Sequence, residues 1–212
     1  MDRLEGEDSG LWAGEYRDQY VKDVPLGKVL EDDCILAYEM NGAPLSAEHG
    51  YPIRALIPGF YGTNSVKWLR RVTLAPRRSE SLFTMKYYNR EVRIKNETAI
   101  EPVWELEVKS LIVRPAKGSI LKRGSWLVTG WAWAATQVYV VEVSSDGGAT
   151  WQRAMLEQAG ADHAWQQFAY LWKPTNVGQY RLMSRATDAC GQAQPISSGG
   201  NRVEPVDVSI VE

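Results

Sequence analysis

The sequence predicts two domains of different fold class, an α+β domain in residues 1–105 and an all-β sandwich in residues 106–212. A chain of 212 residues has room for two modest domains that each bury a core. The first part mixes a short helix signal with strand-like runs and Gly/Pro loops, whereas the second part carries about seven short strand-like runs. Residues 89–105 are polar at first and then contain Pro102-Val103-Trp104, which marks the boundary.

Local signals in the first part predict a short helix and three strands. Asp23 as the cap and Pro25 in the first turn predict the helix at residues 25–30. The strands are predicted where apolar runs end at turn or breaker residues, at 34–40 before Asn41-Gly42, at 55–57 before Pro58-Gly59 and at 72–74 before Pro76. The aromatic side chains of residues 83–88 are expected to pack on the core that these strands form.

In the second part, turn residues separate several of the strand-like runs. The runs are residues 110–113, 125–133, 138–144, 150–156, 165–172, 178–186 and 203–211. In the run 138–144, apolar side chains occupy every second position, at Tyr139, Val141 and Val143. A core between two sheets requires such one-sided strands, so the pattern predicts an antiparallel β-sandwich.

The tryptophans are concentrated in the second part. Seven of the nine Trp follow residue 94, more than one small sandwich normally buries. Either all of them pack inside the sandwich, or some, such as Trp131, Trp133 or Trp172, cover an interface, where aromatic residues are enriched.

The net charge of −2 hides an uneven distribution. Residues 1–48 hold four Lys/Arg against twelve Asp/Glu, residues 49–93 hold nine against two, and the remainder holds eleven against twelve. The middle segment is therefore a basic island that would attract an anionic ligand. Neither flanking segment extends it, and no RRM, KH or helix-turn-helix pattern is present, so we expect no nucleic-acid partner. No apolar run approaches the length of a membrane span, so we expect no membrane partner.

The two cysteines indicate neither a disulfide framework nor a zinc site. Cys34 and Cys190 lie in different predicted domains. Cys34 belongs to an apolar run, and we expect an inert buried thiol. Cys190 precedes Gly191 in a turn-like stretch, and we expect a surface or edge thiol. The only histidines are His49 and His163, so no His/Cys cluster has zinc spacing.

Residues 49–71 combine one histidine and four cations with a loop punctuated by Gly59 and Gly62. Backbone N–H groups in such a loop can point at an anion, and Lys67 closes the loop. The stretch therefore suits a phosphate or a negatively charged cofactor. It is neither a P-loop nor a dinucleotide fingerprint. The structural alternative is a plain connection with a solvated basic face.

Four short motifs follow one another between residues 36 and 69: Leu36-Ala37-Tyr38-Glu39-Met40-Asn41-Gly42, then Glu48-His49-Gly50-Tyr51-Pro52-Ile53-Arg54, then Pro58-Gly59, then Val66-Lys67-Trp68-Leu69. They resemble the molybdopterin-binding core of the sulfite oxidase family, which includes sulfite oxidases, bacterial sulfite dehydrogenases and the molybdenum domain of assimilatory nitrate reductase. The resemblance implies that residues 1–105 are the C-terminal part of that domain, an α+β partial cofactor-binding core. It implies that residues 106–212 are an immunoglobulin-like dimerisation domain.

The resemblance also implies which residues bind the cofactor. His49 and Arg54 would contact the pyranopterin, and Ser65, Val66 and Lys67 would contribute further backbone and side-chain contacts. A pterin with a phosphate tail needs donors, a cation and a close backbone approach, which these residue types supply. We assign no catalytic and no metal-ligating residue.

Three departures from the family pattern limit what the resemblance implies. Many members carry an Arg where this chain has Thr63-Asn64-Ser65. Residues 133–137 lack the Arg that helps sulfite oxidases to bind sulfite, so we do not expect sulfite as the substrate. No stretch matches the motif of the molybdenum-ligating cysteine, and Cys34 lies after its place. The chain alone therefore does not complete the metal centre.

The function predicted from the resemblance is part of a molybdenum-cofactor oxidoreductase, whose chemistry is oxygen-atom transfer with two-electron redox on a small oxyanion. The chain would supply molybdopterin contacts and a homodimer interface, with an upstream cofactor-domain half as a further partner. The alternative is a non-catalytic dimerisation module. If Met1 is the true start, the acidic N-terminus favours the cytoplasm, because it lacks the pattern of a secretory signal; a fragment could be periplasmic.

Overall fold

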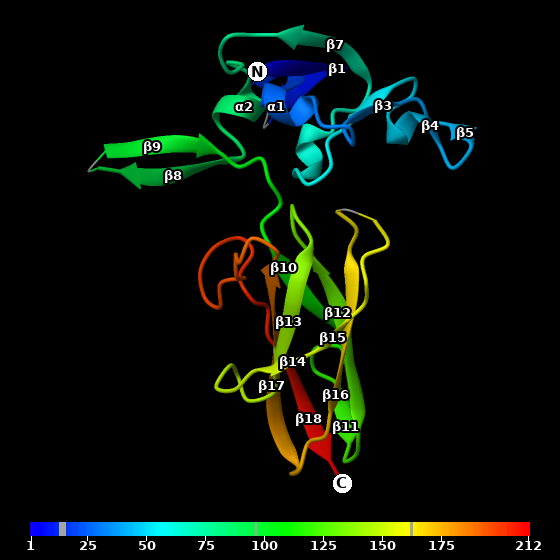
Figure 1. Cartoon of the computed structure of the whole chain (residues 1–212), viewed down its shortest axis with the longest axis vertical. Coiled ribbons are helices and arrows are strands. Elements are labelled where there is room, and N and C mark those ends of the chain that lie inside the picture. Colours follow the sequence, from blue (N-terminus) through cyan, green and yellow to red (C-terminus); the bar gives the residue numbers. More distant parts are fainter. Residues whose placement is uncertain (13–15, 96, 162) are drawn as a thin grey trace. The chain divides into compact units, whose positions relative to one another are not determined.

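The computed structural model describes residues 1–12, 16–95, 97–161 and 163–212, which divide into two compact units, Met1–Glu105 and Leu106–Glu212 (Figure 1). Strands dominate both units. The only α-helices in the described residues are α1 (Leu26–Val29) and α2 (Leu82–Met85), so the helical content is smaller than an α+β class suggests. None of the described helices has the length and apolar character to cross a membrane.

The first unit is organised on a three-stranded antiparallel sheet of order β2-β1-β7. The central strand is β1 (Asp2–Trp12), which pairs with β2 (Tyr16–Val24) on one side and with β7 (Leu69–Leu74) on the other. Our sequence analysis predicted neither β1 nor β2. Buried charged residues, Asp2, Lys22 and Asp23, interrupt the apolar alternation by which a strand is recognised.

Smaller elements complete the first unit. Three further two-stranded pairs form, β3 with β6, β4 with β5 and β8 with β9. The elements are β3 (Ile35–Ala37), β4 (Glu39–Met40), β5 (Ala43–Pro44), η1 (Ala47–His49, a 3₁₀ turn), β6 (Arg54–Leu56), η2 (Gly62–Asn64, also 3₁₀), β8 (Asn89–Ile94) and β9 (Glu97–Pro102). The core of this unit holds Leu4, Val24, Ala55, Ile57, Phe60 and Val66, with the Trp104 ring stacked on Phe60 at 6.4 Å.

Two local predictions need correction. Helix α1 is present, but Pro25 occupies its N-cap position, and the Asp23 carboxylate bonds Arg78 and Ser79 instead of capping it. The run 34–40 is split into β3 and β4 and is not buried, since Ile35 and Leu36 are 50% and 52% exposed. Cys34 is accordingly half-buried, and its Sγ donates to the Lys28 carbonyl at 3.1 Å.

The second unit consists of two sheets. The four-stranded sheet has the order β10-β12-β16-β15 and the five-stranded sheet the order β11-β18-β17-β13-β14, with β11 and β18 as the parallel pair. The strands are β10 (Lys109–Arg114), β11 (Ile120–Lys122), β12 (Trp126–Trp133), β13 (Val138–Ser144), β14 (Gln152–Arg153), β15 (Met155–Leu156), β16 (Gln166–Trp172), β17 (Gly178–Asp188) and β18 (Val206–Val211).

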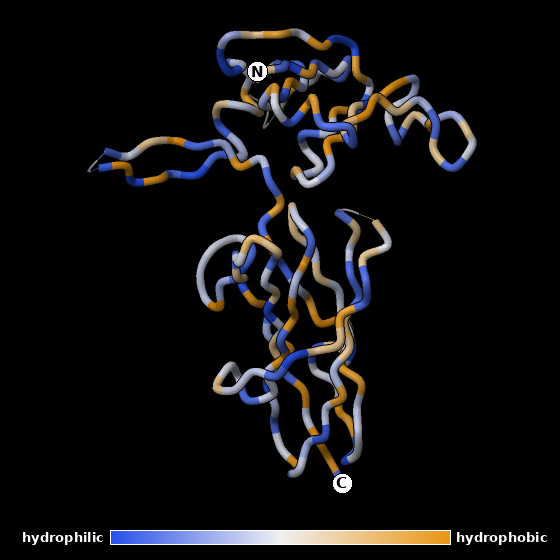
Figure 2. The backbone as a smooth tube through the Cα atoms, in the orientation of Figure 1, coloured by the Kyte–Doolittle hydropathy of each residue, from blue (hydrophilic) through white to orange (hydrophobic). Residues whose placement is uncertain are grey.

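One apolar core lies between these sheets. Val128 and Phe168 face it from the four-stranded sheet, and Val141, Leu182 and Val208 face it from the five-stranded sheet. Hydrophobic and hydrophilic residues alternate along these strands, as the colours in Figure 2 show. Where β12 lies against this core, position 130 requires glycine. A Cβ there would be 1.9 Å from the Leu111 carbonyl oxygen and 2.6 Å from the Phe168 ring. This close approach fixes β12 between β10 and the ring.

The predicted strands of the second unit are present, with two corrections. The run 150–156 is not one strand but β14 and β15, which belong to different sheets. Ala154 is buried between them, and its N–H donates to the Val141 carbonyl at 2.9 Å. Tyr139 is 67% exposed, although we placed it on the core face of β13. A register shift between Val138 and Val140 breaks the alternation there.

A buried charged network joins β2 to the segment that contains α2. Asp23, which has no exposed surface, accepts a bond from Arg78 Nε at 3.1 Å and from the Ser79 N–H at 3.2 Å. Arg78 also donates to the Asn89 side chain and to the Thr84 carbonyl, at 3.1 and 3.0 Å. Removing one partner of a buried pair leaves the other charge without compensation, which makes the network important for stability.

We expect Arg78→Met to lower the free energy of unfolding of the first unit by about 3 kcal/mol, because it leaves the Asp23 carboxylate buried without its cation. Urea unfolding of the full chain, followed by circular dichroism, measures this loss. The matched control is Arg77→Met, whose side chain is 80% exposed and should contribute little. Equal losses in the two variants would contradict the role of the network.

Lys22 provides a pH-dependent test of the same region. Burial lowers the pKa of its ammonium to about 8, although Asp23 opposes the shift, and Arg78 adds to it. Between pH 8 and the ordinary lysine pKa of 10.5, the unfolded chain keeps a proton that the folded chain has released, so this group makes stability rise with pH. Relative to Lys22→Met, the wild type should therefore gain stability between pH 7.5 and pH 9.5 in urea unfolding; an unchanged difference would contradict the assigned burial.

Candidate functional site

The site is built on the 3₁₀ turn η1 (Ala47–His49), whose backbone carbonyls accept bonds from distant side chains. The turn ends at Gly50, which has φ 102°. A Cβ at Gly50 would lie 2.9 Å from Lys67 Cβ, so only glycine permits this approach of the two segments. His49 ends the turn with an exposed ring, and its Nδ1 lies 2.7 Å from Ser46 Oγ.

The segment that returns to this turn brings Lys67 and Trp68. Lys67 Nζ donates to the Glu48 carbonyl at 2.9 Å and lies 4.5 Å above the centre of the Trp68 ring. Trp68 Nε1 donates to the Ala47 carbonyl at 2.8 Å. Trp68 itself has φ 48°, a conformation that is uncommon outside glycine. Two adjacent residues thus hold two carbonyls of one turn.

Arg54 on β6 holds the third carbonyl. Its Nη1 donates to the His49 carbonyl and its Nη2 to the Ser65 carbonyl, both at 3.3 Å. The Nε atom is buried and makes no hydrogen bond within the protein. Burial lowers the pKa of this guanidinium, which still remains charged at neutral pH. Arg54 therefore connects both halves of the site and retains a donor without a partner.

Ser65 and Val66 support the site from beneath. Ser65 Oγ accepts a bond from the Ile57 N–H at 3.0 Å, and the Val66 carbonyl accepts one from the Ala55 N–H at 2.9 Å. The Val66 side chain is 1% exposed and packs in the core. Of the five predicted residues, His49, Arg54 and Lys67 thus meet around η1, Ser65 joins them through its carbonyl, and the Val66 side chain points away.

The predicted role of the glycine loop as a source of free amides is wrong for most of its residues. The loop closes into η2, and the amides of Phe60, Tyr61, Asn64 and Ser65 donate to carbonyls of Ile57, Trp104, Tyr61 and Gly62, respectively. Side chains around η1, rather than these amides, are therefore the donors available to an anion.

A shallow cavity of about 530 Å³ lies beside the turn, lined by Glu7, Asp8, Tyr51, Pro52, Trp68, Leu69 and Arg70. Four of these residues, Tyr51, Pro52, Trp68 and Leu69, belong to the sequence motifs. Burial raises the pKa of the Asp8 carboxyl, and its own backbone N–H and Lys67 oppose this rise. No sequence signal pointed to Asp8, because it lies within a register irregularity of β1, between Glu5 and Ser9.

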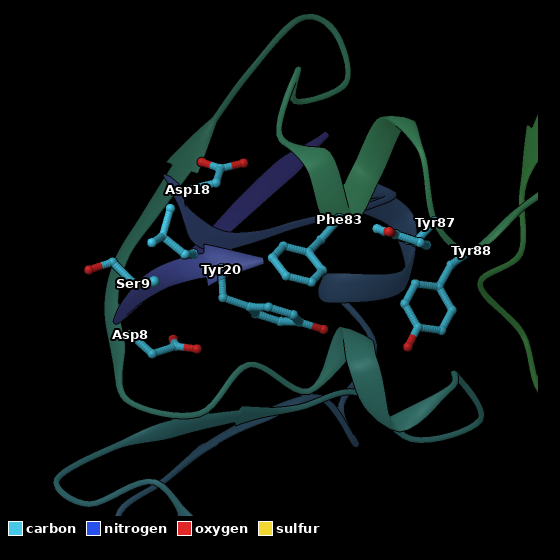
Figure 3. Close-up of a pocket in the computed structure, with 9 residues that line it drawn as sticks. Asp8, Ser9, Asp18, Tyr20, Phe83, Tyr87 and Tyr88 are labelled. Atoms are coloured by element: carbon cyan, nitrogen blue, oxygen red, sulfur yellow. The ribbon is translucent and has the colours of Figure 1, made fainter. Parts of the chain in front are cut away.

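A second cavity, of about 430 Å³, is aromatic (Figure 3). Its lining consists of Asp8, Ser9, Gly10, Leu11, Asp18, Tyr20, Phe83, Tyr87 and Tyr88. The Tyr20 and Phe83 rings are tilted against each other at 4.8 Å, and the Tyr20 hydroxyl donates to the Thr63 carbonyl in η2 at 2.7 Å. Of the aromatic residues 83–88, which we expected to pack on the core, Phe83 contacts Tyr20, and it is Tyr20 that packs against the core. This cavity has none of the five predicted residues in its lining.

Metal ligation was tested on the donors that the structure describes. Among these residues, no group of three or more His, Cys, Asp or Glu side chains is placed to hold a metal ion. Both cysteines are free; Cys190 is exposed as expected, and burial raises the pKa of the Cys34 thiol, which favours its protonated form. The site is therefore one of cationic and neutral donors.

Comparison with known families supports the same assignment. Residues 3–83 match the family model of the oxidoreductase molybdopterin binding domain, and residues 100–201 match that of the Mo-co oxidoreductase dimerisation domain.

Comparison with individual proteins agrees. The chain is 35% identical over 206 residues to sulfite oxidase of Gallus gallus, covering 89% of this chain and 44% of that protein. It is also 35% identical over 194 residues to mitochondrial sulfite oxidase of Homo sapiens, covering 83% and 35%.

Among solved structures, the sulfane dehydrogenase SoxCD of Paracoccus pantotrophus superposes with a TM-score of 0.74 at 27% identity, over 96% of this chain and 53% of that chain. The chain thus spans less than half the length of these two sulfite oxidases. Taken with the motifs around η1, these matches show that the chain belongs to the sulfite oxidase family of molybdopterin-dependent oxidoreductases, of which it carries molybdopterin-binding and dimerisation sequences.

Proposed function

We propose that this chain supplies one wall of a molybdopterin site and a unit for homodimer formation in an oxidoreductase of the sulfite oxidase type. The observation that carries the first part is that Arg54 and Lys67 both donate to backbone carbonyls of the 3₁₀ turn that contains His49. Two cations and an imidazole at one place form a donor set for an anionic, phosphate-bearing ligand. The relatives are named as sulfite oxidases. For this chain we infer the class of substrate from its own residues.

The residues fit the pterin rather than the metal. Arg54 keeps a buried Nε–H without a protein partner, which costs free energy unless a ligand accepts from it. Lys67 has two further N–H donors beyond its bond to Glu48. When bound, the cofactor supplies oxygen-atom transfer with two-electron redox. Cys34 donates to the Lys28 carbonyl, and Cys190 is an exposed residue of the second unit, so we assign the metal's protein thiolate to a further cofactor-domain segment.

Each residue has a distinct task in this proposal. Arg54 and Lys67 neutralise the phosphate charge, and their bonds to the η1 carbonyls hold both side chains in place. The Trp68 ring lies 4.5 Å from the ammonium of Lys67, and this cation–π contact helps to hold the ammonium in place. The substrate class that suits this positive potential is a small oxyanion. Residues 133–137 carry no arginine, so the proposal does not extend to sulfite.

A second function, a non-catalytic dimerisation module, rests on a separate observation. The second unit has its own core of residues from both sheets. Its fold therefore does not depend on a cofactor, and we propose that it is immunoglobulin-like. Metal and pterin analysis distinguishes the two functions, because the module would contain neither.

The test is the pterin content of the chain after expression in a host that makes the molybdenum cofactor. Oxidation to a fluorescent pterin measures occupancy without any assay of activity. We expect Arg54→Met combined with Lys67→Met to lower occupancy by more than about tenfold, because two charge-assisted contacts are lost. The control with the same loss of charge is Arg90→Met combined with Arg93→Met on β8, where both arginines are exposed.

Occupancy near stoichiometry in the wild type and in the control, with loss in the site variant, supports the cofactor role. A wild-type chain without pterin supports the module instead. Equal occupancy in the site variant and the wild type would show that the wall around η1 does not hold the cofactor.

A further inference from the structure

A hollow of about 670 Å³ opens in the second unit beside the end of β10, and the proposed function makes no use of it. Its lining comes from β10, β11, β12 and β16 and from the loop of residues 115–119. Pockets that bind small molecules typically have volumes of about 300–1,000 Å³ and a mainly apolar lining with a few polar groups. The size of this hollow therefore suits a small ligand.

An irregularity of β10 places two polar side chains in the hollow. Ile112 lies opposite Gly130 and Arg114 opposite Thr129, so Val113 is an extra residue in β10. Such a bulge bends its strand and re-aims the side chains that follow. Because Arg114 and Thr129 are directly opposed, their side chains lie on the same face of the sheet, and both line the hollow.

The loop of residues 115–119 is a fixed part of the wall. The Gly118 N–H donates to the Asp207 carbonyl at 2.7 Å, and the Ser209 N–H donates to the Ser119 carbonyl at 2.9 Å. Ser119 Oγ also donates to the Ala116 carbonyl, at 2.7 Å. These bonds form the wall before any ligand arrives, so binding does not have to order it.

Most of the lining is apolar. Leu121 and Trp126 line the hollow and also pack against the core between the two sheets. Leu127 and Trp131 line it as well, and their side chains are 56% and 38% exposed. Trp172, which we had also considered for an interface, is 3% exposed and lies in the core. The hollow thus offers apolar surface to the body of a ligand, and covering that surface is favourable.

Charge identifies the other end of the ligand. Among the described residues that line the hollow, only Arg114 is charged, and its guanidinium makes no ion pair or hydrogen bond with another described side chain. On the other sheet, by contrast, Arg181 and Arg185 are each paired with a carboxylate. Residues 114–123 hold four Lys/Arg and no Asp or Glu, so the potential at this place is positive.

We propose that the hollow binds a small carboxylate with an apolar body. The carboxylate accepts hydrogen bonds from the Arg114 guanidinium, with the Thr129 hydroxyl as a second donor, and the apolar body lies against Leu127 and Trp131. A bare inorganic anion would leave the apolar walls in water, and a neutral apolar molecule would leave Arg114 without a counterion. This inference goes beyond the proposed function and does not rest on it, because the hollow belongs to the second unit, which has its own core.

Calorimetric titration of the full chain with octanoate tests the proposal. The reference ligands are 1-octanol, which has the same apolar body without the charge, and acetate, which has the carboxylate alone. At about 150 mM salt, we expect the wild type to bind one octanoate per chain with a Kd below about 1 mM. The Kd for 1-octanol should be about tenfold higher, because it lacks the charge-assisted contact, and acetate should not bind.

Arg114→Met removes the charge and keeps an apolar stem of similar length. We expect it to weaken octanoate binding about tenfold and to leave 1-octanol binding unchanged. The matched control is Arg123→Met, which removes the same charge from an exposed residue outside the lining and should change the octanoate Kd by less than about twofold. Circular dichroism verifies that both variants are folded. A wild type with a Kd above about 1 mM, or equal affinities in the two variants, would overturn the inference.

The indole N–H signals in a nitrogen–proton NMR titration locate the ligand. Octanoate should shift the Trp131 Nε1–H signal and leave that of Trp151, which is outside the lining and donates to the Gly148 carbonyl at 3.0 Å. Equal shifts of both signals would show that octanoate covers apolar surface without a defined site, and would contradict the proposal. Neither result affects the pterin occupancy, which reports on the cofactor wall of the first unit.

Discussion

The first unit depends on one interaction, the approach of residues 66–69 to the 3₁₀ turn at Ala47–His49. Gly50 permits it, because any Cβ there would collide with Lys67. Two backbone hydrogen bonds hold residues 66–69 in register with residues 53–55, which follow the turn. The Ala55 N–H donates to the Val66 carbonyl and the Leu69 N–H to the Ile53 carbonyl, both at 2.9 Å. The carbonyls of the turn then orient Lys67, Trp68 and Arg54. A short and otherwise unstable turn is thus stabilised by the cations that it positions.

The second unit has two sheets that enclose a core of their own. On the outer face of its five-stranded sheet, Arg181 pairs with Asp207 and Arg185 pairs with Glu142. Each unit has a separate core, so the residues around η1 and the two sheets of the second unit are held in place by separate sets of contacts.

The sequence was informative where a motif or a simple period applied. The motifs predicted that His49, Arg54 and Lys67 belong together, and alternation predicted Val141 and Val143 as core residues. The sequence patterns did not predict the structure where tertiary contacts determine it. Buried Asp2, Lys22 and Asp23 concealed β1 and β2, Ala154 divides an apparently single strand between two sheets, and the register irregularity near Val138 turns Tyr139 outward. The use of the loop amides by η2 likewise depends on pairings that local patterns do not encode.

The central claim is that Arg54 belongs to an anion site, and its side-chain nitrogen signals test this most directly. In a nitrogen–proton NMR titration with inorganic phosphate, the account predicts a saturable shift of the Arg54 Nε–H signal, because that donor has no partner in the protein. The Arg78 Nε–H signal, already bonded to Asp23, should stay unchanged. An Arg54 signal that does not move, or that moves no more than that of Arg78, would contradict the account.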